Sequence, residues 1–335
     1  MITFYSPGER GVDLPGPQQC AELTHKAVWI DLFAPTQEEE TALESALKID
    51  IPTREEMQAI ELSNRLYKEK DVLFMTGTVL TRADSSNPES SAVTFILTPG
   101  RLITLRYVDP FPFKAFRTRR DAIPGEYRTA DDVLVGLIDA IVERVADILE
   151  SVGASLDRIS LEIFDAQAGT DASSRTSRRR RKPERDFVDI LRRIGCNSDL
   201  ISRTRESLVS FGRVVAFFRE MHKDNPQAQD ALVHGKTVGG DLSSLSDHAT
   251  FMSGKVSFLL DATLGMINNE QNVIIKILSV AAVVCGPPTL IAGVYGMNFA
   301  VFPELKWLYG YPFALALMLL SAVLPYTIFK RKGWL

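Results

Sequence analysis

The distribution of charge along the chain separates a long mixed part from two uncharged segments near the C-terminus. No Asp, Glu, Lys or Arg occurs in the 27 residues from Ile277 to Pro303, and none occurs in the 23 from Trp307 to Phe329. A helix of about 20 apolar residues crosses the hydrocarbon core of a bilayer. The pattern therefore predicts two membrane-spanning helices, and their length disfavours the alternative of two buried helices in a soluble domain.

The first 125 residues show the short periodic runs of a mixed α/β domain. Two helix starts are expected, at Pro35-Thr36 and at Pro52-Thr53, because each pair precedes acidic residues. β-Branched runs divided by Gly, Asn and Pro predict strands within residues 27–33, 71–82, 91–100 and 101–109. We expect these strands to be neighbours in one sheet, with helices at its sides.

Helical spacing dominates from about residue 130. Apolar positions predict one helix over 130–164 and a second over 186–223. A third begins near Leu242 and runs through the first uncharged segment to Gly293, which is 52 residues or about 80 Å at 1.5 Å per residue. Such a helix would start in the cytoplasm and end in the outer leaflet, as a stalk does.

Basic residues flank the two segments on the same side. Lys276 precedes the first, and Lys330, Arg331 and Lys332 follow the second, so the positive-inside rule places both termini in the cytoplasm. The N-terminus has neither the basic region nor the apolar core of a signal peptide. We expect a multi-pass protein of the cell (inner) membrane, with a cytoplasmic domain 1–240, a cytoplasmic stalk 241–273, a first span 274–296, an external loop 297–308, a second span 309–329 and a basic tail 330–335.

Composition excludes several functions. The net charge of −4 is mild and predicts no nucleic-acid partner. The basic block Arg178–Lys182 has no interleaved aromatic residues; contact with anionic lipid or an acidic partner stays open there beside a solvated loop. The three cysteines are far apart in the sequence and predict no disulfide in a reducing compartment.

No pattern typical of an enzyme occurs. The four histidines lack metal-ligand spacing, and the chain contains no CxxC, HExxH, phosphate-binding loop or GxSxG motif. We therefore expect neither catalysis nor an organic cofactor.

The first span carries a stripe of small and polar residues. From Ile277 onward it holds no Asp, Glu, Lys, Arg or His, which excludes a proton relay. Small side chains on one face allow close helix packing or leave a narrow lumen; the oxygens of Asn272 and Thr289, and Asn298 at the end of this face, favour the lumen. Heptad steps along the span meet Asn272, Ile275, Ser279, Ala282, Gly286, Thr289, Gly293 and Gly296. The second span is apolar all round, as expected for a lipid-facing helix.

The segment after the first span resembles a known family. The run Tyr295-Gly296-Met297-Asn298-Phe299, followed by Pro303-Glu304-Leu305, a second span and a basic tail ending in Trp-Leu, resembles the CorA family of magnesium transporters. The runs "PTQEEE", "IPTREEM", "LITLR" and "NNEQNVIIKILSV" also resemble family segments in family order. The resemblance covers essentially the whole chain.

The resemblance implies an α+β membrane protein: a homopentameric channel with a cytoplasmic αβα funnel domain, a long stalk helix and two C-terminal spans per subunit. Five copies of Asn298 would hold a hydrated divalent cation, and Gly296 and Met297 would shape the turn. The implied pore-facing positions are Asn272, Leu278, Thr289 and Gly293, with Leu278 in a hydrophobic constriction. Many relatives carry a bulky apolar residue near Gly286; the glycine departs from that pattern, and the presence of an outer hydrophobic gate at that level stays open.

Two further sets of acidic residues follow from the resemblance. Relatives bind regulatory Mg²⁺ between subunits, and Glu55, Glu56 and Asp241 are the nearest matches here. Glu304 in the outer loop would concentrate cations, although a lone loop glutamate also serves solubility. The implied function is passive Mg²⁺ influx, with Co²⁺ and Ni²⁺ as further candidate ions, closed by high cytoplasmic Mg²⁺. A zinc transporter of the same superfamily and a membrane-tethered scaffold are the alternatives.

Overall fold

The computed structural model of the chain describes residues 1–13, 20–59, 61–85, 87–123, 125–168, 186–297, 307 and 309–333. These residues form two compact units, Met1–Leu260 and Asp261–Leu335. The long helix α8 (Gln229–Tyr295) contributes residues to both units. We describe each unit by itself.

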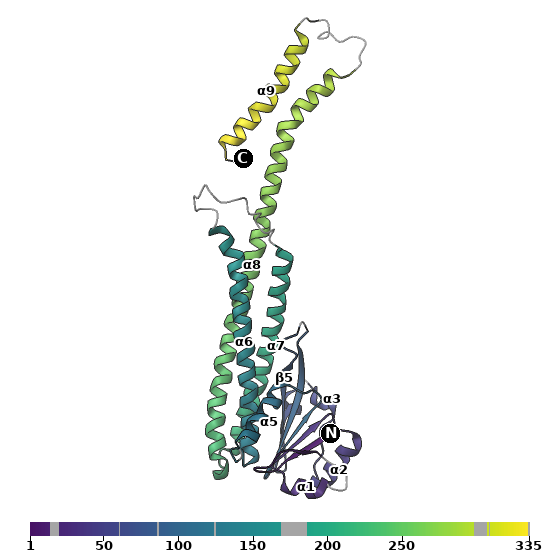
Figure 1. Cartoon of the computed structure of the whole chain (residues 1–335), viewed down its shortest axis with the longest axis vertical. Coiled ribbons are helices and arrows are strands. Elements are labelled where there is room, and N and C mark those ends of the chain that lie inside the picture. Colours follow the sequence, from purple (N-terminus) through teal and green to yellow (C-terminus); the bar gives the residue numbers. More distant parts are fainter. Residues whose placement is uncertain are drawn as a thin grey trace. The chain divides into compact units, whose positions relative to one another are not determined.

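The first unit is built on a mixed sheet of seven strands (Figure 1). The strand order is β2-β1-β3-β7-β6-β5-β4, and only the β3–β7 pair is parallel among the pairs that the structure describes. The strands are β1 (Ile2–Tyr5), β2 (Val12–Asp13), β3 (Trp29–Phe33), β4 (Leu66–Glu69), β5 (Val72–Thr81), β6 (Glu89–Thr98) and β7 (Arg101–Arg106). The four strands expected from the sequence correspond to β3, β5, β6 and β7, whereas β1, β2 and β4 were not predicted.

Helices cover both faces of the sheet, which confirms the predicted αβα arrangement (Figure 1). One face carries α1 (Cys20–Lys26), α2 (Gln37–Leu47), α3 (Arg54–Met57) and α4 (Leu62–Arg65). A buried cluster that includes Ile30, Leu43, Met57 and Ile103 joins these helices to the strands. The other face carries α5 (Phe111–Ala122), α6 (Ala130–Ala168) and α7 (Phe187–His222). The helix α5 was also absent from the sequence-based expectation.

Capping boxes begin the two helices that the Pro-Thr pairs predict. The backbone N–H of Glu39 donates to Thr36 Oγ1 at 3.3 Å, and Glu39 Oε2 accepts from the Thr36 N–H at 2.9 Å. Glu56 makes the same reciprocal pair with Thr53, at 3.3 and 2.8 Å. Each box satisfies two N–H groups that the first turn of a helix leaves without partners. Both helix starts are therefore confirmed.

A buried ion pair links β3 to β7 in the centre of the sheet. Arg106 donates from Nε and Nη2 to the two oxygens of Asp31, at 3.0 and 2.8 Å, and both side chains are only 2% exposed. Thr104 Oγ1 also donates to Asp31, at 2.8 Å. Burial by itself lowers the pKa of Arg106, but the hydrogen bonds and negative charges of Asp31 and Asp109 outweigh it and raise that pKa. The guanidinium is therefore held charged inside the domain.

The helix α8 begins earlier than the sequence pattern indicates. The expected start near Leu242 was wrong, because α8 starts at Gln229, after a short 3₁₀ turn (Pro226–Ala228). The pair Gly239-Gly240 lowers helix propensity and hides this first part of the helix. Packing overrides the propensity: Ala231 and Val238 are buried, and a Cβ on Gly239 would lie 3.6 Å from Val215 of α7. Pro287 and Pro288 also lie inside α8.

Gly77 of β5 lies against the buried aromatic ring of Phe211. A Cβ at this position would be 2.8 Å from Phe211, which is fully buried and packs edge-to-face on Phe95. We expect Gly77→Ala to destabilise the domain by about 1–3 kcal/mol through overpacking. The midpoint of urea unfolding of the detergent-solubilised protein measures this loss.

Gly195→Ala on α7 is the matched control. A Cβ at Gly195 meets nothing within 4 Å, and alanine raises helix propensity, so its midpoint should equal or exceed that of the parent protein. Equal midpoints for Gly77→Ala and the parent protein would show that the Phe211 contact is not restrictive.

Candidate functional site

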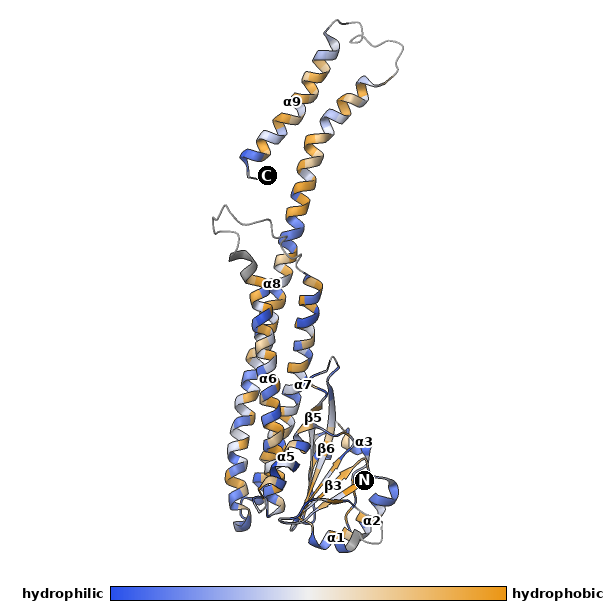
Figure 2. Ribbon diagram, in the orientation of Figure 1, coloured by the Kyte–Doolittle hydropathy of each residue, from blue (hydrophilic) through white to orange (hydrophobic). Residues whose placement is uncertain are grey.

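Two helices of the second unit are long and apolar enough to cross a membrane. They are the C-terminal part of α8 and α9 (Gly310–Arg331), and only 6% of the most apolar window of each is buried. Hydrophobic colour runs along both segments, whereas the N-terminal part of α8 is mixed (Figure 2). A soluble core helix would be mostly covered, so these exposed apolar surfaces require a lipid or protein environment.

One face of α8 in this unit is partly covered. Val280 is buried, and the half-buried positions Val284, Pro287, Pro288, Ile291 and Tyr295 follow on the same face. The helix α9 has a matching stripe, in which Gly310 and Ala314 are buried and Met318, Ser321 and Pro325 are half-buried. These stripes are the faces of the two helices that are partly covered among the described residues.

The small-residue stripe lies on the opposite face of α8 and is exposed throughout. It comprises Asn272, Ile275, Ser279, Ala282, Gly286, Thr289, Gly293 and Gly296. A shallow groove runs over its outer half and includes Ala282, Gly286, Thr289 and Gly293. Leu278 is 69% exposed and lies beside Ser279, just off the midline of the stripe. One chain thus leaves a face with polar oxygens and little bulk open along the whole span.

The oxygen of Thr289 remains usable on this face. Its hydroxyl donates to the carbonyl of Cys285, one turn earlier, at 2.8 Å. The donor is therefore occupied, and the lone pairs of the hydroxyl oxygen are available to accept from a donor such as a cation's hydration water.

The end of α8 is tight at Gly296. The Gly296 N–H donates to the Ala292 carbonyl at 2.9 Å, and the Met297 N–H donates to Val294 at 3.2 Å. A Cβ on Gly296 would lie 3.1 Å from the Ala292 oxygen, so a side chain would crowd the last turn. Met297 is exposed and lines the groove. The predicted cation-binding Asn298 and cation-attracting Glu304 lie outside the described residues, as does the block Arg178–Lys182.

The candidate regulatory carboxylates do not meet within one chain. Glu55 is exposed on α3, and Glu56 is engaged by the cap at Thr53. Asp241 lies on α8, near Asp139 of α6. The pKa of Asp139 is raised first by burial, then by the negative charge of Glu143 and, to a smaller extent, by that of Asp241. No group of three or more His, Cys, Asp or Glu within the described ranges could hold a metal ion. Any regulatory site built from these residues requires a neighbouring chain.

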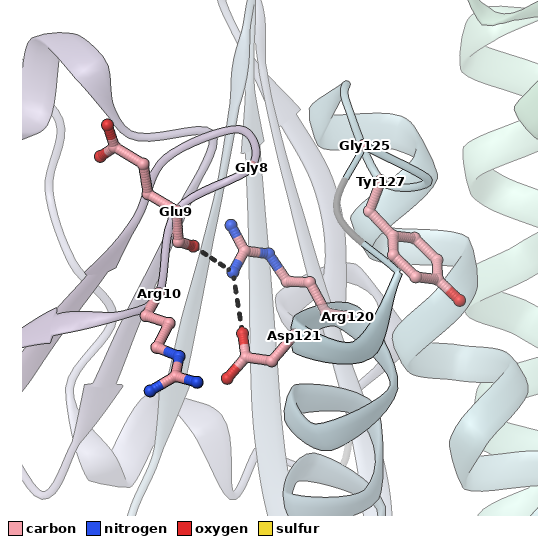
Figure 3. Close-up of a pocket in the computed structure, with 7 residues that line it drawn as sticks. All are labelled: Gly8, Glu9, Arg10, Arg120, Asp121, Gly125 and Tyr127. Atoms are coloured by element: carbon pink, nitrogen blue, oxygen red, sulfur yellow. Dashed lines mark hydrogen bonds and ion pairs between the residues drawn. The ribbon is translucent and has the colours of Figure 1, made fainter.

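A small hollow beside β1 and α5 has a structural role. Figure 3 shows Arg120 directed at the Gly8–Glu9 turn, where its guanidinium donates to the Glu9 carbonyl at 2.9 Å. The Ser6 carbonyl accepts from the same side chain at 2.5 Å. The hollow is about 30 Å³, comparable to the space of one water molecule in the liquid. The two hydrogen bonds of Arg120 anchor the turn that follows β1.

Two exposed apolar helices, each long enough to span a bilayer, are the feature expected of an integral membrane protein. The chain belongs to the family of CorA-like Mg²⁺ transporter proteins, which matches residues 24–331. Members of this family are transporters or channels and not enzymes, which confirms the expectation drawn from the absent catalytic motifs.

Named relatives agree over nearly the full length. The chain is 34% identical to "Magnesium transport protein CorA" of Mannheimia succiniciproducens over 311 residues, 93% of each chain. It is 33% identical to the protein of the same name from Salmonella typhimurium over 310 residues, 92% of each chain. These values confirm the family resemblance drawn from the Gly-Met-Asn segment.

The fold also matches a solved full-length structure. The complete structure of the CorA magnesium transporter from Methanocaldococcus jannaschii superimposes with a TM-score of 0.73 at 17% identity, covering 100% of this chain and 99% of that one. The full-length CmaX protein gives 0.64 at 15% identity, covering 99% and 97%. These likenesses confirm the fold class predicted from the sequence.

Proposed function

We propose that this protein is a passive channel for Mg²⁺ influx, formed by five copies of the chain in the inner membrane with both termini in the cytoplasm. The observation that carries the proposal is the exposed stripe of α8, which leads without an ionisable group from Asn272 to Gly296. Five such faces turned toward one axis would enclose a lumen lined by small side chains and neutral oxygens, with α9 facing lipid.

Neutral oxygens suit the chemistry of the ion. Mg²⁺ releases its hydration waters reluctantly and prefers oxygen ligands. A ring of Asn298 carboxamides binds the hydrated ion through its waters, so no dehydration is needed at the outer mouth. A ring of carboxylates would hold the ion more strongly and slow its exit. Asn272, Thr289 and Gly293 would continue the path, and Leu278 would form an apolar constriction.

The membrane potential supplies the driving force. Moving one charge across 100 mV is worth about 2.3 kcal/mol, so a doubly charged ion gains about 4.6 kcal/mol on entering. No coupled reaction is required for uptake.

The experiment that tests this function is uptake by the purified protein in liposomes, followed with a Mg²⁺-sensitive dye under an imposed inside-negative potential. Mg²⁺ entry that rises with the potential supports a channel. Parallel assays with Co²⁺, Ni²⁺ and Zn²⁺, with and without a pH gradient, distinguish the zinc-transporter alternative. Absence of any cation flux would favour a membrane-tethered scaffold and overturn the proposal.

Glu304 is proposed to raise the local cation concentration outside. We expect Glu304→Gln to weaken uptake mainly at low external Mg²⁺ and low ionic strength, because a surface field is screened beyond about 8 Å at physiological salt. Initial uptake rates across a series of Mg²⁺ and salt concentrations measure this. An equal loss at saturating Mg²⁺ would instead indicate that Glu304 maintains the loop structure.

Closure by cytoplasmic Mg²⁺ is proposed to act through carboxylates at subunit contacts. Without a cation between them, like charges repel and the subunits separate; bound Mg²⁺ removes the repulsion and favours the closed, symmetric ring. We expect the triple variant Glu55→Gln, Glu56→Gln and Asp241→Asn to lose the protection from limited proteolysis that the parent protein acquires at about 1 mM Mg²⁺. Glutamine keeps the cap at Thr53, because it accepts the same hydrogen bond.

A second triple variant controls for the change in charge. Glu38→Gln, Glu61→Gln and Asp230→Asn neutralise three other exposed acids, and their Mg²⁺-dependent protection should be unchanged. If the first triple variant is also protected normally, the sensor lies elsewhere, for example at Asp247 or Asp71.

A further inference from the structure

A second exposed stripe runs along α8 within the first unit. Asp247, Phe251, Gly254 and Phe258 follow one another at steps of four, three and four residues, and all four are exposed. The two phenylalanines are 68% and 59% exposed, far more than is usual for aromatic side chains of a folded domain. Among the described residues, this stripe is left exposed.

The opposite face of the same helix is already occupied. Met252 and Leu259 are almost completely buried, and the methyl group of Met252 lies 3.7 Å from the position of a Cβ on Gly153 of α6. Lys255 Nζ also pairs with Asp157 of α6 at 2.5 Å. Because α6 holds α8 by this face, Phe251 and Phe258 lie outside the buried contact, and Phe258 meets α6 through the exposed ring of Phe164.

The spacing of the stripe continues into the membrane span. From Phe258, alternating steps of three and four residues meet Asp261, Gly265, Asn268 and Asn272, and Asn272 begins the stripe that we propose lines the lumen. A repeat of 3.5 residues sustained over this length is the pattern by which identical helices wind around a common axis. This spacing indicates that the stripe faces the same stripe of α8 in further copies of the chain.

Phe258 also has a defined position within its own subunit. Its ring stacks on that of Phe164 near the end of α6, with centroids 5.9 Å apart and planes 22° apart. Phe251 stacks on His248. These contacts restrict the rings while leaving most of their surface exposed, which suits side chains that line a cavity shared between copies.

We propose that Phe258, with Phe251 one heptad earlier, forms an aromatic constriction at the cytoplasmic end of the ion path. The inference rests on the proposed channel function. Apolar rings at a narrow level exclude water, and an ion that keeps its hydration shell cannot pass until the helices separate. The acidic positions Asp247 and Asp261 on the same stripe would provide cation-attracting levels on either side of this barrier.

The test compares three variants of the full-length protein in liposomes, with about 1 mM Mg²⁺ on the side of the large domain to favour closure. Phe258→Ala should increase the residual Mg²⁺ flux several-fold, because the barrier is removed. Phe258→Leu should keep the flux low, since it retains apolar bulk. Leu260→Ala, at a position on the same helix that is off the stripe, should match the parent protein.

Cross-linking gives an independent measurement of geometry. In a background with Cys20, Cys196 and Cys285 replaced by serine, Phe258→Cys should form disulfide-linked dimers on addition of copper-phenanthroline, and Leu260→Cys should form far fewer. Equal flux for Phe258→Ala and the parent protein, or equal cross-linking at the two positions, would overturn the constriction. Lack of flux in the parent protein would overturn the proposed function instead, so the two failures are distinguishable.

Discussion

Asn298→Ala is expected to reduce Mg²⁺ uptake by about a hundredfold or more while the oligomer remains assembled. Five carboxamides would each lose a hydrogen bond to the hydration shell of the ion, and one such bond contributes about 1 kcal/mol. Because all five subunits lose this bond, the losses of binding free energy add up around the ring. Dye-reported uptake in liposomes measures the flux, and native electrophoresis of the same sample measures assembly.

Asn298→Asp tests whether the neutral amide is required, because aspartate has nearly the same size and shape but carries a negative charge. A carboxylate retains the oxygen acceptors but adds five negative charges, so the ion should bind more tightly and leave more slowly. Uptake should fall, and binding of divalent cations to the detergent-solubilised protein should strengthen. Near-normal flux in a correctly assembled Asn298→Ala channel would remove this ring from the mechanism.

Arg106→Met is expected to produce the largest loss of stability in the first unit. The substitution leaves the Asp31 carboxylate at 2% exposure without its guanidinium partner. Removing one member of a buried pair costs about 3–5 kcal/mol, because the remaining charge stays desolvated. The fall in the urea midpoint of the purified protein measures this loss.

The double variant Asp31→Leu with Arg106→Met tests the cause. Replacing both charges with apolar groups should recover much of the stability, since the uncompensated charge is gone. Arg101→Met, at the half-buried start of the same strand, is the control for loss of a positive charge. A midpoint for Arg106→Met equal to that of the Arg101→Met control would show that the buried pair is not decisive.

Local patterns predicted most of the elements. The Pro-Thr pairs at Thr36 and Thr53, each followed by acidic residues, were sufficient to place two helix starts, because a capping box involves only neighbouring residues. The exposed stripe of α8 followed from the heptad spacing in the same way. The spacing of Thr53 and Glu56 is also that of a capping box, a role of Glu56 that was missed because this residue was considered only as a regulatory ligand.

Non-local contacts could not be predicted in this way. The pair of Asp31 and Arg106 joins residues 75 positions apart, and nothing near either residue indicates its partner. The early start of α8 depends on packing against α7, which compensates for Gly239 and Gly240. The short strands β1, β2 and β4 depend on pairing with distant strands. Contacts between copies of the chain, including any regulatory site, remain predictions.

The two prolines inside α8 have a mechanical consequence for the proposed channel. Pro287 and Pro288 have no N–H, so the carbonyls of Val283 and Val284 lack their usual main-chain donors. A helix without these two bonds bends more easily at this level than elsewhere along its length. Torque generated on the cytoplasmic side would therefore be absorbed below Thr289, and the turn at Gly296 would keep its shape while the inner part of the helix moves. Ion selection and opening would then be mechanically insulated from each other.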